Sequence, residues 1–90
     1  MADGFAFPYM VQTYSTVLDS WYDGSTWQDI RDASVALRDT ARRTAANTEK
    51  RIVYRVPGST EYGRDSRETL HIVWQGKRVP DWLGQSVASN

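Results

Sequence analysis

The sequence STWQDIRDASVALRDTARRTAA, residues 25–46, carries the clearest structural pattern in this chain. Its apolar side chains recur at steps of three and four residues, the spacing that places them on one face of an α-helix. Ser25 and Gln28 have the spacing of a capping box, and Asp29 suits the positive end of the helix dipole. We therefore predict an amphipathic helix that packs on the rest of the fold. Its packing stripe consists of Trp27, Ile30, Ala33 or Ser34, Leu37, Ala41 and Ala45.

Two segments after this helix alternate between apolar and other side chains, as strands with one buried face do. They are Lys50–Val56 and Thr69–Trp74, and the polar stretch Ser59–Glu68 between them is predicted to be a loop. We expect the two strands to form an antiparallel hairpin. The helix would cover the hairpin face made by Ile52, Tyr54, Val56, Leu70, Ile72 and Trp74.

The segment Tyr9–Trp21 has two interpretations. Its Val, Thr and Tyr content favours a strand, yet its larger apolar residues also fall on one helical face. Asp23-Gly24 is predicted to be the turn that leads into the helix. A strand gives an α+β fold of order β-α-β-β, with one helix on a three-stranded mixed sheet whose first two strands are parallel. A helix gives the order α-α-β-β, which is similar to a winged-helix protein.

The ninety residues are predicted to form a single domain, 1–90, with a thin core that depends on aromatic side chains. Residues 1–7 would be an apolar N-terminal arm, and residues 85–90 a frayed tail. Pro80–Gly84 could form one helical turn that lays Trp82 and Leu83 on the core.

Eleven basic and eleven acidic residues cancel, which argues against a general polyanion binder. The absence of Cys excludes disulfides and thiolate catalysis, and no apolar run approaches the ~20 residues that span a bilayer. We expect a cytoplasmic protein that does not enter a membrane. Nine of the eleven basic residues are Arg, which indicates GC-rich coding of the kind found in actinobacteria and their phages.

The sequence favours a protein that is not an enzyme. His71 is the one histidine, and neither a nucleophile motif nor a phosphate-binding glycine loop accompanies it. A metal site would have to be completed by carboxylates alone, because no second His and no Cys exist. We therefore expect no catalytic residue, no metal and no cofactor.

The leading functional hypothesis is a non-catalytic accessory protein that acts by stoichiometric binding to another protein chain or to a second copy of itself. The sheet face opposite the helix would carry Val53, Arg55, His71 and Val73, and such a face is too apolar to be only solvated. The aromatic arm with Phe5 and Phe7 offers a second contact. A three-stranded sheet also leaves two edges that natural proteins usually pair or cover.

The alternative hypothesis is a small DNA-binding regulator with the winged-helix-like layout. The central helix would enter the major groove, and the loop between the last two strands would be the wing. Small phage excisionases and regulators are similar in size and in order of elements. Gln28 and Arg31 would read bases, and the remaining contacts would come from Arg38, Arg42, Arg43, Arg64 and Arg67.

Overall fold

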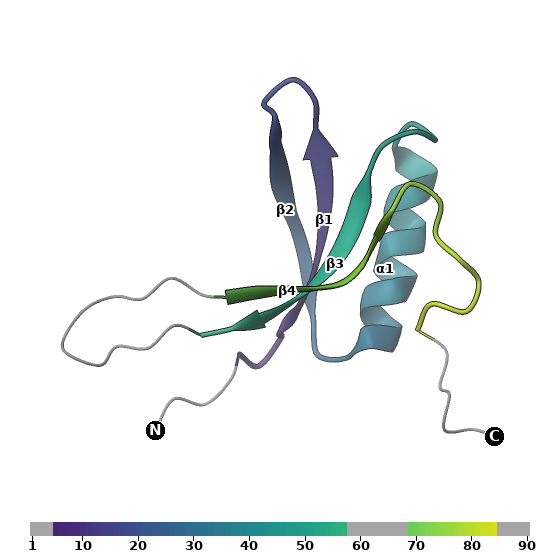
Figure 1. The fold of residues 1–90 in the computed structure, drawn as a ribbon. Helices are drawn as coiled ribbons and strands as arrows, with labels where there is room; N and C mark the ends of the chain where they lie inside the picture. Colours follow the sequence, from purple (N-terminus) through teal and green to yellow (C-terminus); the bar gives the residue numbers. More distant parts are fainter. Residues whose placement is uncertain (1–4, 58–68, 85–90) are drawn as a thin grey trace.

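The computed structural model describes residues 5–57 and 69–84. These residues form β1 (Tyr9–Ser15), β2 (Ser20–Trp27), α1 (Ile30–Arg43), β3 (Lys50–Val56) and β4 (Thr69–Gly76). The strands make one sheet in the order β2-β1-β3-β4, and every neighbouring pair is antiparallel. Figure 1 shows α1 lying against this sheet. A small α+β domain with an amphipathic helix packed on a sheet is therefore confirmed, with four strands in place of three.

The segment predicted as Tyr9–Trp21 is two strands of a hairpin and not one element. A turn at residues 16–19 separates β1 from β2, and Asp19 takes a positive φ of 52° there. Since β1 pairs with both β2 and β3 in antiparallel fashion, the predicted parallel pair with its crossover is wrong. The winged-helix-like order is also wrong, because a strand stands where its first helix would be.

Asp23 and Gly24 were predicted as a turn, but they lie inside β2 at a bulge. A Cβ on Gly24 would stand 2.7 Å from the main-chain oxygen of Val11. Glycine therefore lets β2 approach β1 closely where its ladder is irregular, which is a common role of a glycine inside a strand. The strand continues to Trp27, so the helix begins later than the sequence pattern indicated.

The helix begins after Asp29 and not at Ser25. The Asp29 carboxylate accepts a 2.9 Å hydrogen bond from the main-chain N–H of Asp32, which makes Asp29 the N-cap. Thr44 caps the other end, where its N–H donates to the Thr40 carbonyl. Ala33 and Leu37 on the inner face are fully buried, so the middle of the predicted stripe is confirmed.

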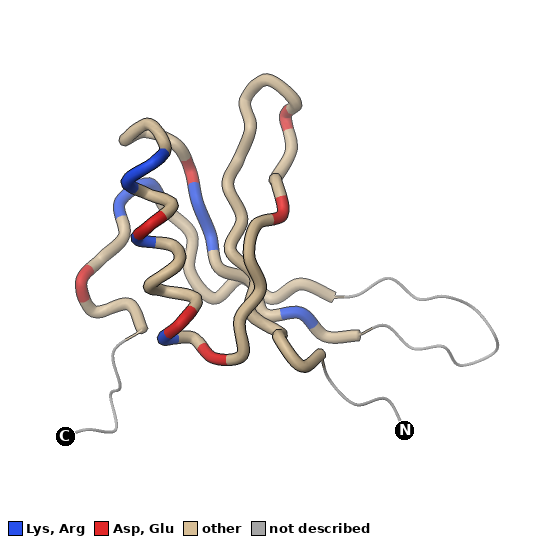
Figure 2. Tube along the Cα trace, turned by 180° about the vertical axis from the view of Figure 1, so that it is seen from behind, with Lys and Arg blue, Asp and Glu red and all other residues tan. Residues whose placement is uncertain are grey.

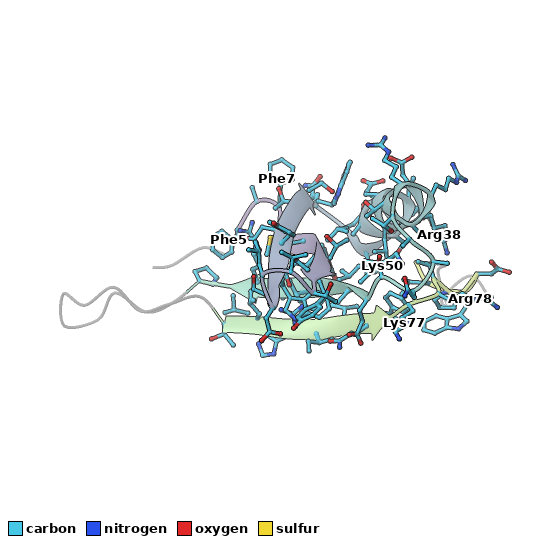
Figure 3. The ribbon with its side chains drawn as sticks, turned by 90° about the horizontal axis from the view of Figure 1, so that it is seen from above. Phe5, Phe7, Arg38, Lys50, Lys77 and Arg78 are labelled. Carbon is cyan, nitrogen blue, oxygen red and sulfur yellow. The ribbon has the colours of Figure 1, made fainter. Side chains whose placement is uncertain are left out.

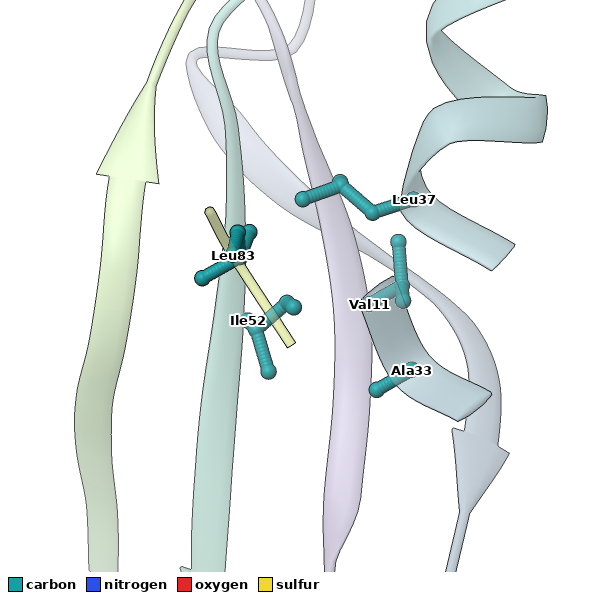
Figure 4. Packing of buried hydrophobic residues seen from close by; sticks show 5 residues of the cluster. All are labelled: Val11, Ala33, Leu37, Ile52 and Leu83. Atoms are coloured by element: carbon teal, nitrogen blue, oxygen red, sulfur yellow. The ribbon is translucent and has the colours of Figure 1, made fainter. Parts of the chain in front are cut away.

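The core lies between α1 and the sheet and is small (Figure 4). It consists of Val11, Ala33, Leu37, Ile52 and Leu83, with larger side chains such as Trp27 and Trp74 packed around it. Leu83 reaches this core from the turn that follows β4, as predicted, whereas Trp82 is 64% exposed. Gly84 has a φ of +84°, and a Cβ there would stand 2.5 Å from the Ser34 hydroxyl. Glycine thus allows the turn to rest directly on α1.

A second bulge changes which side chains of β4 face the helix. Ile52 pairs with Trp74, but the next residue, Val53, pairs with Ile72, so Val73 is an extra residue in β4. Side chains alternate along a strand, so one inserted residue moves all those beyond it to the other face. The predicted face with Leu70, Ile72 and Trp74 together is therefore wrong. Leu70 and Ile72 lie opposite Trp74, on the side away from α1.

Candidate binding surfaces

The four residues predicted to form an open sheet face do not form one surface. Val53 is 0% exposed, although it faces away from α1. His71 pairs with Tyr54 and lies on the other side of the sheet from Val53 and Arg55, while Val73 sits in the bulge. The prediction of a shared face for these residues is wrong, because the bulge in β4 shifts the register.

The N-terminal arm covers part of the sheet on the Val53 side. The guanidinium of Arg55 lies 4.3 Å above the centre of the Phe5 ring, and its Nη2 donates a 2.8 Å hydrogen bond to the Phe7 carbonyl. The Arg55 N–H also donates to the carbonyl of Pro8 at 2.9 Å. Phe5 is half-buried, whereas Phe7 is exposed (labelled in Figure 3). The prediction that this side of the sheet is left uncovered is therefore wrong around Arg55.

A polar ladder occupies another part of that face. Gln12 is buried, donates a 2.8 Å hydrogen bond to Asp23 and accepts one of 2.6 Å from Nε of Arg51. The Arg51 guanidinium also stacks 4.1 Å from the ring centre of Trp21. Burial lowers the pKa of Arg51, and the Asp23 carboxylate opposes that shift. These contacts link β2, β1 and β3, so we interpret the ladder as structural.

Three exposed apolar side chains lie on β4. Leu70, Ile72 and Val73 are 37%, 56% and 43% exposed. β4 pairs with β3 along one edge, and no described strand pairs with its other edge. Its sequence, TLHIVWQG, has neither Lys nor Pro, the residues with which proteins commonly protect an exposed edge.

The opposite edge of the sheet, β2, is protected against pairing. It contains a bulge at Gly24, and the charged Asp23 lies within the strand. Bulges and charges both discourage a further strand from adding to an edge. β4 also has a bulge, at Val73, but it contains no Asp, Glu, Lys or Arg, so it is the better place for a second polypeptide to pair.

The residues predicted to contact DNA have different positions and contacts in the structure. Gln28 and Arg31 are exposed at the start of α1, next to the acidic Asp29 and Asp32. Arg43 forms a 2.7 Å ion pair with Asp39. Arg64 and Arg67 lie outside the described residues.

Arg38 has a structural role that the sequence did not indicate. Its Nη2 lies 2.8 to 3.1 Å from three main-chain oxygens, those of Pro80, Asp81 and Leu83. These hydrogen bonds attach the turn after β4 to α1, so Arg38 holds the segment that delivers Leu83 to the core.

Basic residues lie close together along the chain trace where the C-terminal half of α1 is beside the start of β3 and the segment after β4 (Figure 2). Figure 3 shows four of them, Arg38, Lys50, Lys77 and Arg78, at this end of the molecule. They line a hollow of about 360 Å³ together with Arg42 from α1. Asp81 is the one acidic residue among the described residues that line it. We call this hollow the basic hollow.

Lys50 is the most unusual side chain of the basic hollow, because it is 1% exposed. Its ammonium donates hydrogen bonds to the carbonyls of Thr48 at 2.7 Å and Lys77 at 2.9 Å. No carboxylate within residues 5–57 and 69–84 forms an ion pair with it. Burial lowers the pKa of Lys50 from its usual 10.5, because desolvation disfavours the charged form.

The sequence contains a signal for this buried lysine. Lys50 is in phase with Ile52, so the strand pattern places it on the face that packs toward α1. Lys77 and Arg78 carried no comparable signal, because their approach to α1 depends on the path of the chain after β4.

Neither a metal cluster nor a membrane-spanning helix is present within the described ranges. No three His, Asp or Glu side chains come together there in a way that could hold a metal ion. The helix found there is also too short and too polar to cross a bilayer.

Comparison with known proteins gives no relative. No protein-family model, curated protein or solved structure matches this chain.

Proposed function

We propose that this chain is a non-catalytic interaction protein that pairs the free edge of β4 with a strand of another polypeptide. The observation that carries this proposal is an eight-residue edge strand with exposed apolar side chains and without Asp, Glu, Lys, Arg or Pro. A bulge at Val73 interrupts this strand but adds no charge to its edge. Addition of a strand to such an edge is a common mode of peptide recognition, in which main-chain hydrogen bonds supply much of the affinity.

The chemistry of β4 describes the strand that it would accept. On one face of the sheet the incoming strand would lie beside Leu70 and Ile72, and on the other beside His71 and Trp74. Apolar or aromatic side chains on each face of the incoming strand would continue the corresponding surface of β4. Proline would be excluded because it cannot donate to the ladder.

A second copy of β4 meets these requirements. Antiparallel self-pairing is compatible with two-fold symmetry. β4 also contains no Asp, Glu, Lys or Arg that would repel its own copy. The net charge of zero adds little long-range repulsion between copies. We therefore propose a homodimer that pairs through β4 as the first form to test, with a strand of a different protein as the second.

The test compares Ile72→Lys with Val17→Lys in sedimentation equilibrium. Both substitutions introduce the same charge at an exposed apolar residue, but Val17 lies in the turn between β1 and β2 and is 91% exposed. We expect the unmodified protein and the Val17 variant to dimerise and the Ile72 variant to remain monomeric. Should the unmodified protein stay monomeric at millimolar concentration, self-pairing is excluded.

The second form is tested by capture from a lysate with the same two variants. A partner that binds β4 would be retained by the Val17 variant and lost with the Ile72 variant. Equal retention by both would place the contact elsewhere and contradict the proposal.

The alternative of DNA binding now depends only on the basic hollow. The winged-helix-like layout no longer supports it, and acidic residues lie among the exposed arginines of α1. A salt-dependent titration with duplex DNA tests it, since binding through several phosphates weakens steeply as salt is raised.

A further inference from the structure

We propose that the basic hollow is a binding site for a phosphate group, carried as free phosphate or as the monoester of a small molecule. This inference is independent of the pairing at β4, because none of the hollow's described residues lies within that strand. It depends on three observations: the charge of the lining, the position of Lys50, and the size of the hollow.

The lining has a large excess of positive charge for a protein with no net charge. Among the described residues that line it, Asp81 has the one carboxylate, whereas five are basic: Arg38, Arg42, Lys50, Lys77 and Arg78. Arg38 is engaged by three carbonyls, but the side chains of Arg42, Lys77 and Arg78 make no hydrogen bond or ion pair with any described residue. Their donors are therefore available to a ligand.

Lys50 contributes a buried cation to the lining of the hollow. Two carbonyls take two of its three N–H donors, which leaves one donor without a partner among the described residues. A buried ammonium that has no carboxylate partner is costly, because carbonyl dipoles compensate only part of the lost hydration. An anion in the hollow would supply the missing negative charge.

The hollow fits a phosphate group better than a nucleic acid. Its volume of about 360 Å³ holds one phosphate with a small organic group, within the range of small-molecule sites. Guanidinium groups such as those of Arg42 and Arg78 match phosphate oxygens in pairs. A nucleic acid would need a longer basic surface, but Asp32 and Asp39 lie on α1 before Arg42 and interrupt its positive charge.

The experiment is calorimetric titration of the full chain with inorganic phosphate and with phenyl phosphate, at constant ionic strength maintained with chloride. Lys77→Gln and Arg78→Gln remove charge from the hollow while keeping the main-chain carbonyl that holds Lys50. Arg43→Gln is the matched control, because Arg43 lies outside the hollow and pairs with Asp39. We expect one saturable site, at least fivefold weaker in the first two variants and unchanged in the control.

A second measurement reports on Lys50 without replacing it. The side-chain ammonium resonance of Lys50 should shift with the same saturation curve as the calorimetric titration. An unshifted Lys50 resonance, no saturation by either probe, or equal weakening in the Arg43 variant would overturn the proposal. Duplex DNA that binds more tightly than both phosphates and displaces them would assign the hollow to nucleic acid and overturn it as well.

Discussion

The ammonium of Lys50 donates a 2.9 Å hydrogen bond to the main-chain carbonyl of Lys77, a residue 27 positions further along the chain. This contact joins the first residue of β3 to the segment that leaves β4. The same segment continues to Leu83, which enters the core, and is held to α1 by Arg38. One buried cation and one half-buried cation thus fix the path of the chain after the sheet ends.

Burial of Lys50 gives stability a defined dependence on pH. The pKa of Lys50 in the folded protein is below 10.5, its value in the unfolded chain. At pH values between the folded and the unfolded pKa, the unfolded chain therefore binds more protons at this residue than the folded chain. The free energy of unfolding should therefore rise with pH across that interval. Urea unfolding from pH 7 to pH 10 should show the unmodified protein gaining stability relative to Lys50→Met. A difference that stays constant or shrinks as pH rises would contradict this.

Replacement of Arg38 by Met should release the turn after β4. The substitution keeps most of the aliphatic stem but removes the donor shared by three carbonyls, which we expect to cost about 1–3 kcal/mol in the free energy of unfolding. Arg31→Met on the exposed start of α1 is the control and should change stability by less than about 0.5 kcal/mol. Equal effects in urea unfolding would show that Arg38 does not hold the turn.

Leu83→Ala should be among the most damaging single substitutions near the C-terminal part of the described chain. Leu83 is 4% exposed and belongs to the core, so truncation should cost about 2–5 kcal/mol. The neighbouring Trp82→Ala removes a larger side chain that is mostly exposed, and its thermal midpoint should move much less. The opposite ranking would mean that Trp82, and not Leu83, packs on the core.

The position of the helix N-cap can be tested by Asp29→Ala against Ser25→Ala. Loss of the Asp29 hydrogen bond to the Asp32 N–H should cost about 0.5–2 kcal/mol. Ser25 lies in β2, and its hydroxyl accepts only an exposed hydrogen bond from Trp27, so its loss should have a smaller effect on chemical denaturation. A greater loss with the Ser25 variant would support the helix start predicted from sequence.

Gly24→Ala should destabilise the sheet more than Gly76→Ala. The added methyl group would meet a main-chain oxygen of Val11 at 2.7 Å, and the pairing of β1 with β2 fixes that oxygen in place. At Gly76 the obstacle is the ring of Trp74 at 2.9 Å, a side chain that has some freedom to move. We expect a cost of about 1–3 kcal/mol for the Gly24 variant in urea unfolding. A smaller cost than that of the Gly76 variant would contradict the bulge geometry.

The candidate sites were only partly predictable, because they depend on strand registers. Val53, Arg55, His71 and Val73 were assigned to one face by simple alternation, and the bulge at Val73 broke that alternation. The basic hollow depends on contacts between residues about 30 to 40 positions apart, which no local pattern encodes.

The sequence by itself determined the elements whose signal is periodic. These are the amphipathic helix with Ala33 and Leu37 inward and the strand Lys50–Val56. The return of Leu83 to the core was predicted from the short turn at Pro80–Gly84. Periodicity is a local property, since burial of one face requires apolar side chains at fixed steps.

Only the tertiary structure decided the order β2-β1-β3-β4, the role of Gly24 as a bulge and the partial cover of the Val53 face by Phe5. Each depends on which segments meet across the sheet. A glycine such as Gly24 is compatible with a turn or with a bulge. Alternation of apolar and polar side chains along a strand is likewise compatible with a parallel or an antiparallel neighbouring strand. The choice between them is made by packing of the whole chain, in which long-range contacts outweigh local preference.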